Sequence, residues 1–352
     1  MAGVDDLVDW ELAEQTGVRL CRPGPAVGIT AARQAVAELR GAAVEARGHV
    51  RAYTGLDAPA AATPVVVVDR PTWVRSNVAG LREMLAPLSA RMPQRPVPAP
   101  VRSAGSKVTA SEAGALLAFL SSKVLGQYEM GAPGDSGRLL LVAPNIVAAE
   151  AELDLPASDF RLWVCLHEET HRVQFGAVPW LRDHLVSAVG EVLIGVDTDP
   201  AAVGRRLVAV LGALVAAARR QPGPSLAEAV TSPAQRDAVA RITAVMSLLE
   251  GHADVVMDGV GPAVVPSVAT IRERFASRRE ATSTFDAVTR RLLGLEDKAA
   301  QYRDGARFVR AVQDAVGREG FNRVWSSPTA LPSPAELADP AAWVARVVPP
   351  AS

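Results

Sequence analysis

Three residues in one short stretch of the chain have the types and the spacing of a metal site. His167, Glu168 and His171 follow the order H-E-x-x-H within residues 162–175, a run without glycine or proline. Residues four apart lie one above the other on a helix, so both imidazoles can bind one Zn²⁺ at about 2.0–2.1 Å. Glu168 then lies beside the pair, where a carboxylate acts as general base toward a metal-activated water. The triplet therefore predicts a hydrolytic zinc centre.

The residues around this triplet are apolar, among them Leu162, Val164, Leu166 and Val173. A coincidental match on a solvated helix face would be flanked by polar residues. A buried helix, in contrast, has little reason to carry histidine and glutamate side chains without a partner, because burying unpaired polar groups costs free energy. The flanks therefore favour a metal site over a chance match.

A catalytic zinc ion usually has three protein ligands and one open position. The extended pattern H-E-x-x-H-x-x-G-x-x-H is excluded because the chain has Gln174 and Ala177 at the required positions, and the same Ala177 excludes an aspartate ligand there. The apolar, periodic segment 238–257 predicts a second helix that carries Glu250 and Asp254 four residues apart on one face. Glu250 can complete a His₂Glu site, and Asp254 can accept the free ring N–H of a ligating histidine.

Other side chains compete for these roles. His184 or Glu191 could reach the metal if the chain doubled back after the first helix. His252 lies two positions after Glu250, about 200° round the helix, so we expect it to point away from the metal. His252 or Tyr128 could instead donate a hydrogen bond to the oxyanion of the transition state, the alternative for each being an ordinary packing role.

The order of the two motifs resembles a known family. H-E-x-x-H followed by E-x-x-x-D on a later helix is similar to the gluzincin pattern of thermolysin-type metallopeptidases. The resemblance implies that His167, His171 and Glu250 are the zinc ligands, that Glu168 is the general base, and that Asp254 orients a ligating histidine.

The segment between the motifs, residues 172–249, is longer than in thermolysin-like enzymes, which implies an inserted helical segment from residue 180 to about residue 221. More closely, L-H-E-x-x-H-R-V-Q-F together with L-L-E-G-H-A-D-V-V-M-D resembles a family of bacterial zincin-like hydrolases, some of which are labelled as associated with biosynthesis of the deazaflavin coenzyme. The similarity covers most of the chain up to the Glu250 helix. The label reflects gene context and not a demonstrated reaction, so the resemblance implies the fold and leaves the substrate open.

The remaining segments predict an α+β fold that is mostly α, with a zincin-like core, a small sheet and additional helices. Helices are expected at residues 5–16, 30–53, 71–90, 111–125 (capped by Ser111) and 298–319, and strands at residues 64–69 and 138–143. The second strand is expected to form the edge that lines the cleft. Five prolines within residues 87–100 interrupt regular structure.

These signals divide the chain into three parts. Residues 1–100 form an N-terminal helical region with one buried strand packed on the core, residues 101–330 the catalytic region, and residues 331–352 a proline-rich tail. Leu337 and Trp343 are expected to hold this tail against the body.

The amino-acid composition predicts neither a nucleic-acid nor a membrane partner. The 352 residues include 37 Lys and Arg against 38 Asp and Glu, a net charge of −1, so no basic field attracts nucleic acid or a membrane surface. The acidic N-terminus does not resemble a secretory signal, no apolar run of about 18 residues occurs, and two cysteines are too few for a disulfide framework. A cytoplasmic protein is the expectation.

We therefore expect a zinc-dependent hydrolase, first of all a metallopeptidase, that cleaves a peptide or amide bond with Zn²⁺ as cofactor. One alternative is a non-catalytic binding or scaffold protein stabilised by a sealed zinc site, in which Glu168 is dispensable. A small-amide hydrolase of coenzyme metabolism is another alternative, which depends on the family label alone.

Overall fold

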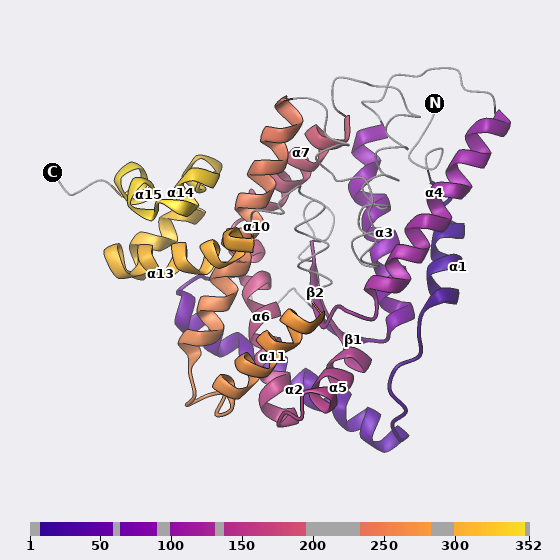
Figure 1. Ribbon diagram of the computed structural model, residues 1–352, viewed down its shortest axis with the longest axis horizontal. Coiled ribbons are helices and arrows are strands. Elements are labelled where there is room, and N and C mark those ends of the chain that lie inside the picture. Colours follow the sequence, from indigo (N-terminus) through magenta and orange to yellow (C-terminus); the bar gives the residue numbers. More distant parts are fainter. Residues whose placement is uncertain are drawn as a thin grey trace.

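A three-stranded sheet lies among the helices of the computed structural model, which describes residues 8–58, 64–89, 99–130, 137–194, 233–282 and 299–348 (Figure 1). The strands are β1 (Val65–Val68), β2 (Gly126–Glu129) and β3 (Arg138–Val142). The helices are α1 (Trp10–Leu20), α2 (Ile29–Thr54), α3 (Arg70–Ser89), α4 (Ala99–Leu120), α5 (Ala143–Glu152), α6 (Ala157–Ala177), α7 (Leu181–Ile194), α10 (Pro233–Val260), α11 (Val268–Thr282), α13 (Ala299–Asn322), α14 (Pro334–Ala338) and α15 (Pro340–Val347). The described chain is thus mostly helical with one small mixed sheet, as the sequence predicts.

The sheet has the strand order β1-β3-β2. β1 runs parallel to β3, with Val65 opposite Leu139, and β2 runs antiparallel to β3, with Gly126 opposite Leu141. The expected edge strand at residues 138–143 is therefore wrong in position, because this strand is central. Its leucines are buried, which is typical of a strand flanked on both sides. The two edges of the described sheet are β1 and β2, and the sequence of β2, Gly-Gln-Tyr-Glu, has too few apolar residues to predict a strand.

Alternate residues of the strands face two different helical layers. Leu140 and Val142 pack in one core cluster with Trp10, Val74 and other residues of α1, α3 and α4. Leu141 packs on the opposite face with residues of α2, α5 and α6. Figure 1 shows the sheet between these two groups of helices. This alternation follows from the two-residue period of a strand.

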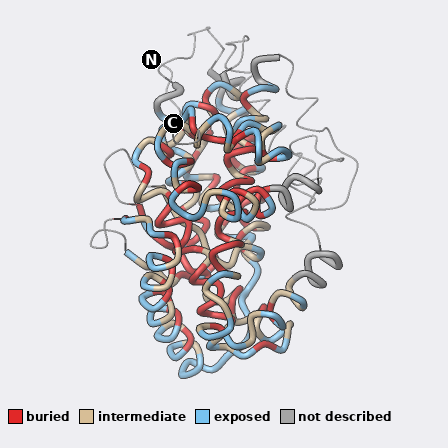
Figure 2. The backbone as a smooth tube through the Cα atoms, turned by 90° about the vertical axis from the view of Figure 1, so that its left-hand side faces the viewer, coloured by how far each residue is buried: buried red, intermediate tan, exposed pale blue. Residues whose placement is uncertain are grey.

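Helix α10 joins this body to the C-terminal helices. It packs on α6, α7 and α13, and a separate core cluster contains residues of α7, α10 and α13–α15. The α10 and α13 backbones meet at two glycines: a Cβ on Gly251 would lie 2.2 Å from the carbonyl carbon of Gly305, and one on Gly305 would lie 2.0 Å from the Ser247 oxygen. Figure 2 shows that the buried residues line the inward faces of the packed helices.

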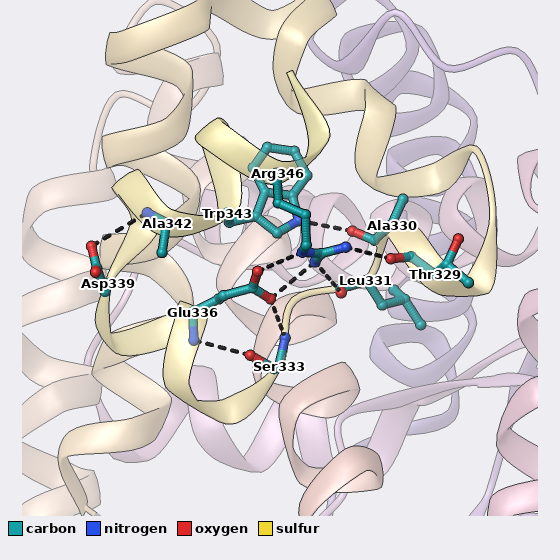
Figure 3. A network of polar contacts seen from close by, with 9 residues as sticks. All are labelled: Thr329, Ala330, Leu331, Ser333, Glu336, Asp339, Ala342, Trp343 and Arg346. Atoms are coloured by element: carbon teal, nitrogen blue, oxygen red, sulfur yellow. Dashed lines mark hydrogen bonds and ion pairs between the residues drawn. The ribbon is translucent and has the colours of Figure 1, made fainter. Parts of the chain in front are cut away.

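The last helices and the segment before them form a small polar network (Figure 3). Ser333 and Glu336 make a capping box at the start of α14. Arg346 donates to Glu336 at 2.6 Å and to the Thr329 oxygen at 2.6 Å. Trp343 is completely buried and donates from its indole to the Ala330 oxygen at 2.8 Å. Leu337 is buried as well, so the expected packing of this segment on the body is confirmed.

Several helix boundaries differ from the expected ones. α4 begins at Ala99 rather than at Ser111, which lies inside the helix and donates to the Lys107 oxygen instead of capping an N-terminus. α5 occupies a segment for which no helix was expected. α3 ends at Ser89, beyond the first proline of the proline-rich stretch. Residues 90–98 of that stretch and the part of the expected inserted segment from residue 195 onward lie outside the described residues.

Within the described ranges, we find no helix with the length and apolar character needed to cross a bilayer.

Candidate metal centre

Helix α6 carries the H-E-x-x-H triplet and is held in place on several sides. It packs between α2 and α10 and also contacts β2. Near its start, Arg161 donates to Glu150 of α5 at 3.0 Å. Glu169, the second glutamate of the motif, is fully buried and accepts a hydrogen bond from Arg172 at 2.7 Å, so it serves the packing of the helix. This leaves Glu168 as the acidic side chain of the motif beside the histidines.

Three side chains bring their ligand atoms together at one point. The Nε2 atoms of His167 and His171 are 3.1 Å apart, and Glu250 of α10 places Oε2 at 3.5 Å from the first and Oε1 at 3.5 Å from the second. Ligands about 2.05 Å from a tetrahedral zinc ion are about 3.3 Å from one another. The observed separations match that edge length, so the donor set fits zinc. Among the described residues, this is the one group of at least three His, Cys, Asp or Glu side chains that could hold a metal ion.

The three ligands are partly open to solvent. The exposed side-chain fraction is 24% for His167, 11% for His171 and 38% for Glu250. A structural zinc site has its four positions filled by protein, whereas a catalytic site keeps one position free. An accessible set of three ligands is therefore typical of a catalytic site.

Glu168 lies against the edge strand β2. A Cβ on Gly126 would be 2.5 Å from Cγ and 2.6 Å from Cδ of Glu168, so the strand passes directly against this side chain. Burial raises the pKa of Glu168 well above its ordinary value, and the nearby charge of Glu250 raises it further. The carboxyl group is thus held beside the ligand set by a strand position that leaves no room for a side chain.

A buried amide connects one ligand to the helix of another. Gln174 is fully buried, and its Oε1 lies 2.9 Å from Nδ1 of His171. Its Nε2 donates to the Leu249 oxygen at 3.0 Å and lies 3.0 Å from Nδ1 of His252. Burial, and then the neighbouring His171, lowers the pKa of His252 to about 3, so this imidazole is neutral.

The other residues singled out in the sequence have the following surroundings. The Tyr128 ring of β2 stacks on Phe175 at 5.5 Å. His252 is 1% exposed, with its ring 5.2 Å from Phe321, so it lies in the core behind His171. The backbone oxygen of Asp254 accepts from Arg272 at 2.9 Å, and its carboxylate lies 3.7 Å from the same guanidinium.

The rival third ligands lie in a different environment. The ring of His184 meets Trp180 edge-on at 6.0 Å, and burial together with the nearby Arg241 lowers its pKa. Glu191 pairs with the same Arg241. The ligand cluster found among the described residues contains neither of them.

Two residues of the site were not recognised from the sequence as part of it. Gln174 occupies the position at which the extended pattern H-E-x-x-H-x-x-G-x-x-H has glycine, and the sequence gives it no role of its own. Gly126 is a glycine in a polar stretch. Neither position carries a local signal, because the partners of both come from distant parts of the chain.

Comparisons with known proteins agree with this geometry. The zincin-like metallopeptidase family matches the chain over residues 8–344. A crystal structure from Chloroflexus aurantiacus, provisionally described as a hydrolase with a novel fold, superposes with a TM-score of 0.69 at 29% sequence identity, covering 98% of this chain and 100% of that chain. No curated protein matches.

Proposed function

Because the chain belongs to the zincin-like metallopeptidase family, we propose that it is a zinc-dependent hydrolase that cleaves peptide bonds. His167, His171 and Glu250 are the proposed metal ligands, and Glu168 is the proposed general base. The observation that carries the proposal is the solvent-accessible cluster of ligand atoms. The two histidine Nε2 atoms are 3.1 Å apart, and each lies 3.5 Å from one carboxylate oxygen of Glu250.

A zinc ion in this site would supply Lewis-acid activation of a water molecule and of a substrate carbonyl. Glu168 accepts a proton from the attacking water and returns it to the leaving amine. Its close contact with Gly126 limits the movement of the carboxylate toward β2, and a fixed position favours this proton transfer.

Two further residues have proposed roles. Asp254 is one helical turn after Glu250 on α10, and we assign it as the acceptor for the second ring nitrogen of His167. Tyr128 lies on the same edge strand as Gly126, and we assign its hydroxyl as the donor to the developing oxyanion. His252, which lies in the core, is assigned a supporting role instead.

The edge strand favours an extended peptide over a compact small amide as substrate. Among the described strands, β2 pairs on one side with β3 and has no strand on its other side. An extended peptide can add to such an edge through main-chain hydrogen bonds. A peptide bound along β2 would pass Gly126, and therefore Glu168, at its point of closest approach.

The exposure of the ligands argues against a sealed scaffold site, which would exclude water from the metal. With Glu250 38% exposed, the site admits a substrate group. The scaffold alternative predicts a metal that resists chelators and an active-site glutamate without function.

The test begins with zinc content, measured by plasma mass spectrometry on protein purified without a metal-affinity column. We expect one zinc per chain in the wild type and in the control Glu191→Ala, and much less in Glu250→Ala. Undiminished zinc in Glu250→Ala would move the third ligand elsewhere, with His184→Ala as the next variant.

The zinc-loaded protein is then incubated with a peptide library, and new termini are identified by mass spectrometry. Glu168→Gln should keep its zinc and lose at least about 10²-fold in cleavage rate, the usual contribution of general acid–base catalysis. Wild-type cleavage by zinc-loaded Glu168→Gln would refute the mechanism. Cleavage of small amides but of no peptide would replace the proposed substrate class.

A further inference from the structure

We propose that Gln174 is a positioning residue that fixes the tautomer of His171 and, through the same side chain, the place of the helix that carries Glu250. The inference rests on the proposed metal site and adds to it a buried support outside the ligand set. It follows from the three polar atoms that contact the Gln174 amide: Nδ1 of His171, the Leu249 oxygen and Nδ1 of His252.

The orientation of the amide is determined by its neighbours. The atom 3.0 Å from the Leu249 carbonyl oxygen must be the donor Nε2, because a carbonyl oxygen can only accept. Oε1 therefore faces Nδ1 of His171 at 2.9 Å, and Nδ1 must carry the hydrogen of this bond. The Nε2 atom of His171 then carries no hydrogen, and its lone pair is available to a metal ion between His167 and Glu250.

His252 secures this orientation. Its Nδ1 lies 3.0 Å from the same Gln174 Nε2, so that Nε2 donates to two acceptors. Rotating the amide by 180° would place Oε1 against the Leu249 oxygen, which cannot donate, and would require the other tautomer of His252. The His252 ring is itself held between Phe321 at 5.2 Å and Trp325 at 5.5 Å.

Gln174 also crosses the interface between the two ligand-bearing helices. It belongs to α6, one turn after His171, and it bonds to the α10 backbone at Leu249, the residue immediately before Glu250. One fully buried side chain thus fixes the direction of a nitrogen ligand and the position of the oxygen ligand opposite to it. Loss of a partner that orients a ligand typically weakens metal affinity 10- to 100-fold.

The first experiment needs no substitution at Gln174. Long-range ¹H–¹⁵N spectra of the metal-free protein at pH 8 report the tautomer of each of the five histidines, and His171→Ala identifies the His171 signals. We expect His171 as the Nδ1–H tautomer before any zinc is added. An Nε2–H tautomer, or fast exchange between the two, would overturn the inference.

The second experiment measures zinc affinity by competition with a chelator of known affinity. Gln174→Met keeps the volume but no hydrogen bond, and it should weaken zinc binding about 10- to 100-fold. The matched control is Thr170→Val: Thr170 is on the same helix and equally buried, and its hydroxyl donates to the Leu166 oxygen of its own helix. Gln174→Glu retains the acceptor for His171 and should recover part of the affinity.

The outcomes separate this inference from the proposed function. If the wild type binds zinc, Glu250→Ala loses it, and Gln174→Met binds as tightly as Thr170→Val, the inference is wrong and the metal site stands. Equal affinities of Gln174→Met and Gln174→Glu would overturn the tautomer role. If the wild type binds no zinc but His171 is the Nδ1–H tautomer, the proposed function fails and the role of Gln174 in orienting His171 survives.

Discussion

The contact between Gly126 and Glu168 predicts that Gly126→Ala will impair catalysis without removing the metal. The new Cβ would lie 2.5 Å from Cγ of Glu168, and ordinary contacts begin at 3.4 Å, so the carboxylate or the strand must move by about 0.9 Å. A misplacement of about 1 Å in a catalytic group costs about 10²-fold in rate, or about 2.7 kcal/mol of transition-state stabilisation. The proposed zinc ligands belong to α6 and α10, not to β2, so zinc content should stay at the wild-type level.

The assay is kcat on a fluorogenic peptide taken from the library screen, together with zinc content and Tm. The control is Gly80→Ala on α3, whose Cβ would meet nothing within 4 Å; it should keep wild-type kcat and leave Tm unchanged or higher. A wild-type kcat in zinc-loaded Gly126→Ala would show that the position of Glu168 against β2 does not matter for the reaction. Loss of zinc would show that the clash is relieved by displacing the ligands, which contradicts the expected rigidity of α6.

Two further predictions concern stability. In Gly251→Ala the new Cβ would lie 2.2 Å from the backbone of Gly305, so α10 and α13 must separate; we expect a loss of about 1–3 kcal/mol and weaker zinc binding, and an unchanged Tm would contradict the close contact. Burial raises the pKa of Glu336, but hydrogen bonds from Arg346 and Ser333 outweigh it, and the net pKa lies below the ordinary value of 4.5. The stabilisation by Glu336 is therefore complete above about pH 4.5 and is lost as the pH falls through the lower folded-state pKa. Glu336→Gln should cost about 1–2 kcal/mol in urea unfolding at pH 7 and much less at pH 3, and an equal cost at both would refute the assignment.

The parts of the site that the sequence could predict are those with local periodicity. Both ligand-bearing helices combine an apolar face with polar residues at a spacing of four, and this pattern alone aligns His167 with His171 and singles out Glu250. The second helix was expected at residues 238–257 and spans Pro233–Val260. Whether His167, His171 and Glu250 lie in one cluster depends on how the two helices pack. Catalytic zinc requires a third protein ligand, however, and this requirement limits the candidates to a few side chains.

The features that escaped prediction depend on contacts between distant residues. Gln174 orients His171 only because the Leu249 oxygen lies opposite, 75 positions further along the chain. Gly126 matters because β2 lies against α6, and a four-residue strand of mixed polarity gives no signal of its own. The early start of α4 was missed because Pro100 was interpreted as a break, whereas proline is well tolerated in the first turn of a helix.

The glycine contact between α10 and α13 also determines when the site can be completed during synthesis. The ribosome releases His167 and His171 well before Glu250, and Gly305 follows later still. A nascent chain that ends before α10 has only the two imidazoles of the candidate site. A chain that ends before α13 also has Glu250, but the face of α10 that packs on α13 is still uncovered. Because N-terminal segments fold first during synthesis, we expect the complete set of proposed metal ligands to form only near the end of translation. In a cell short of zinc, the fully translated chain would therefore have the candidate ligands in place and no metal between them.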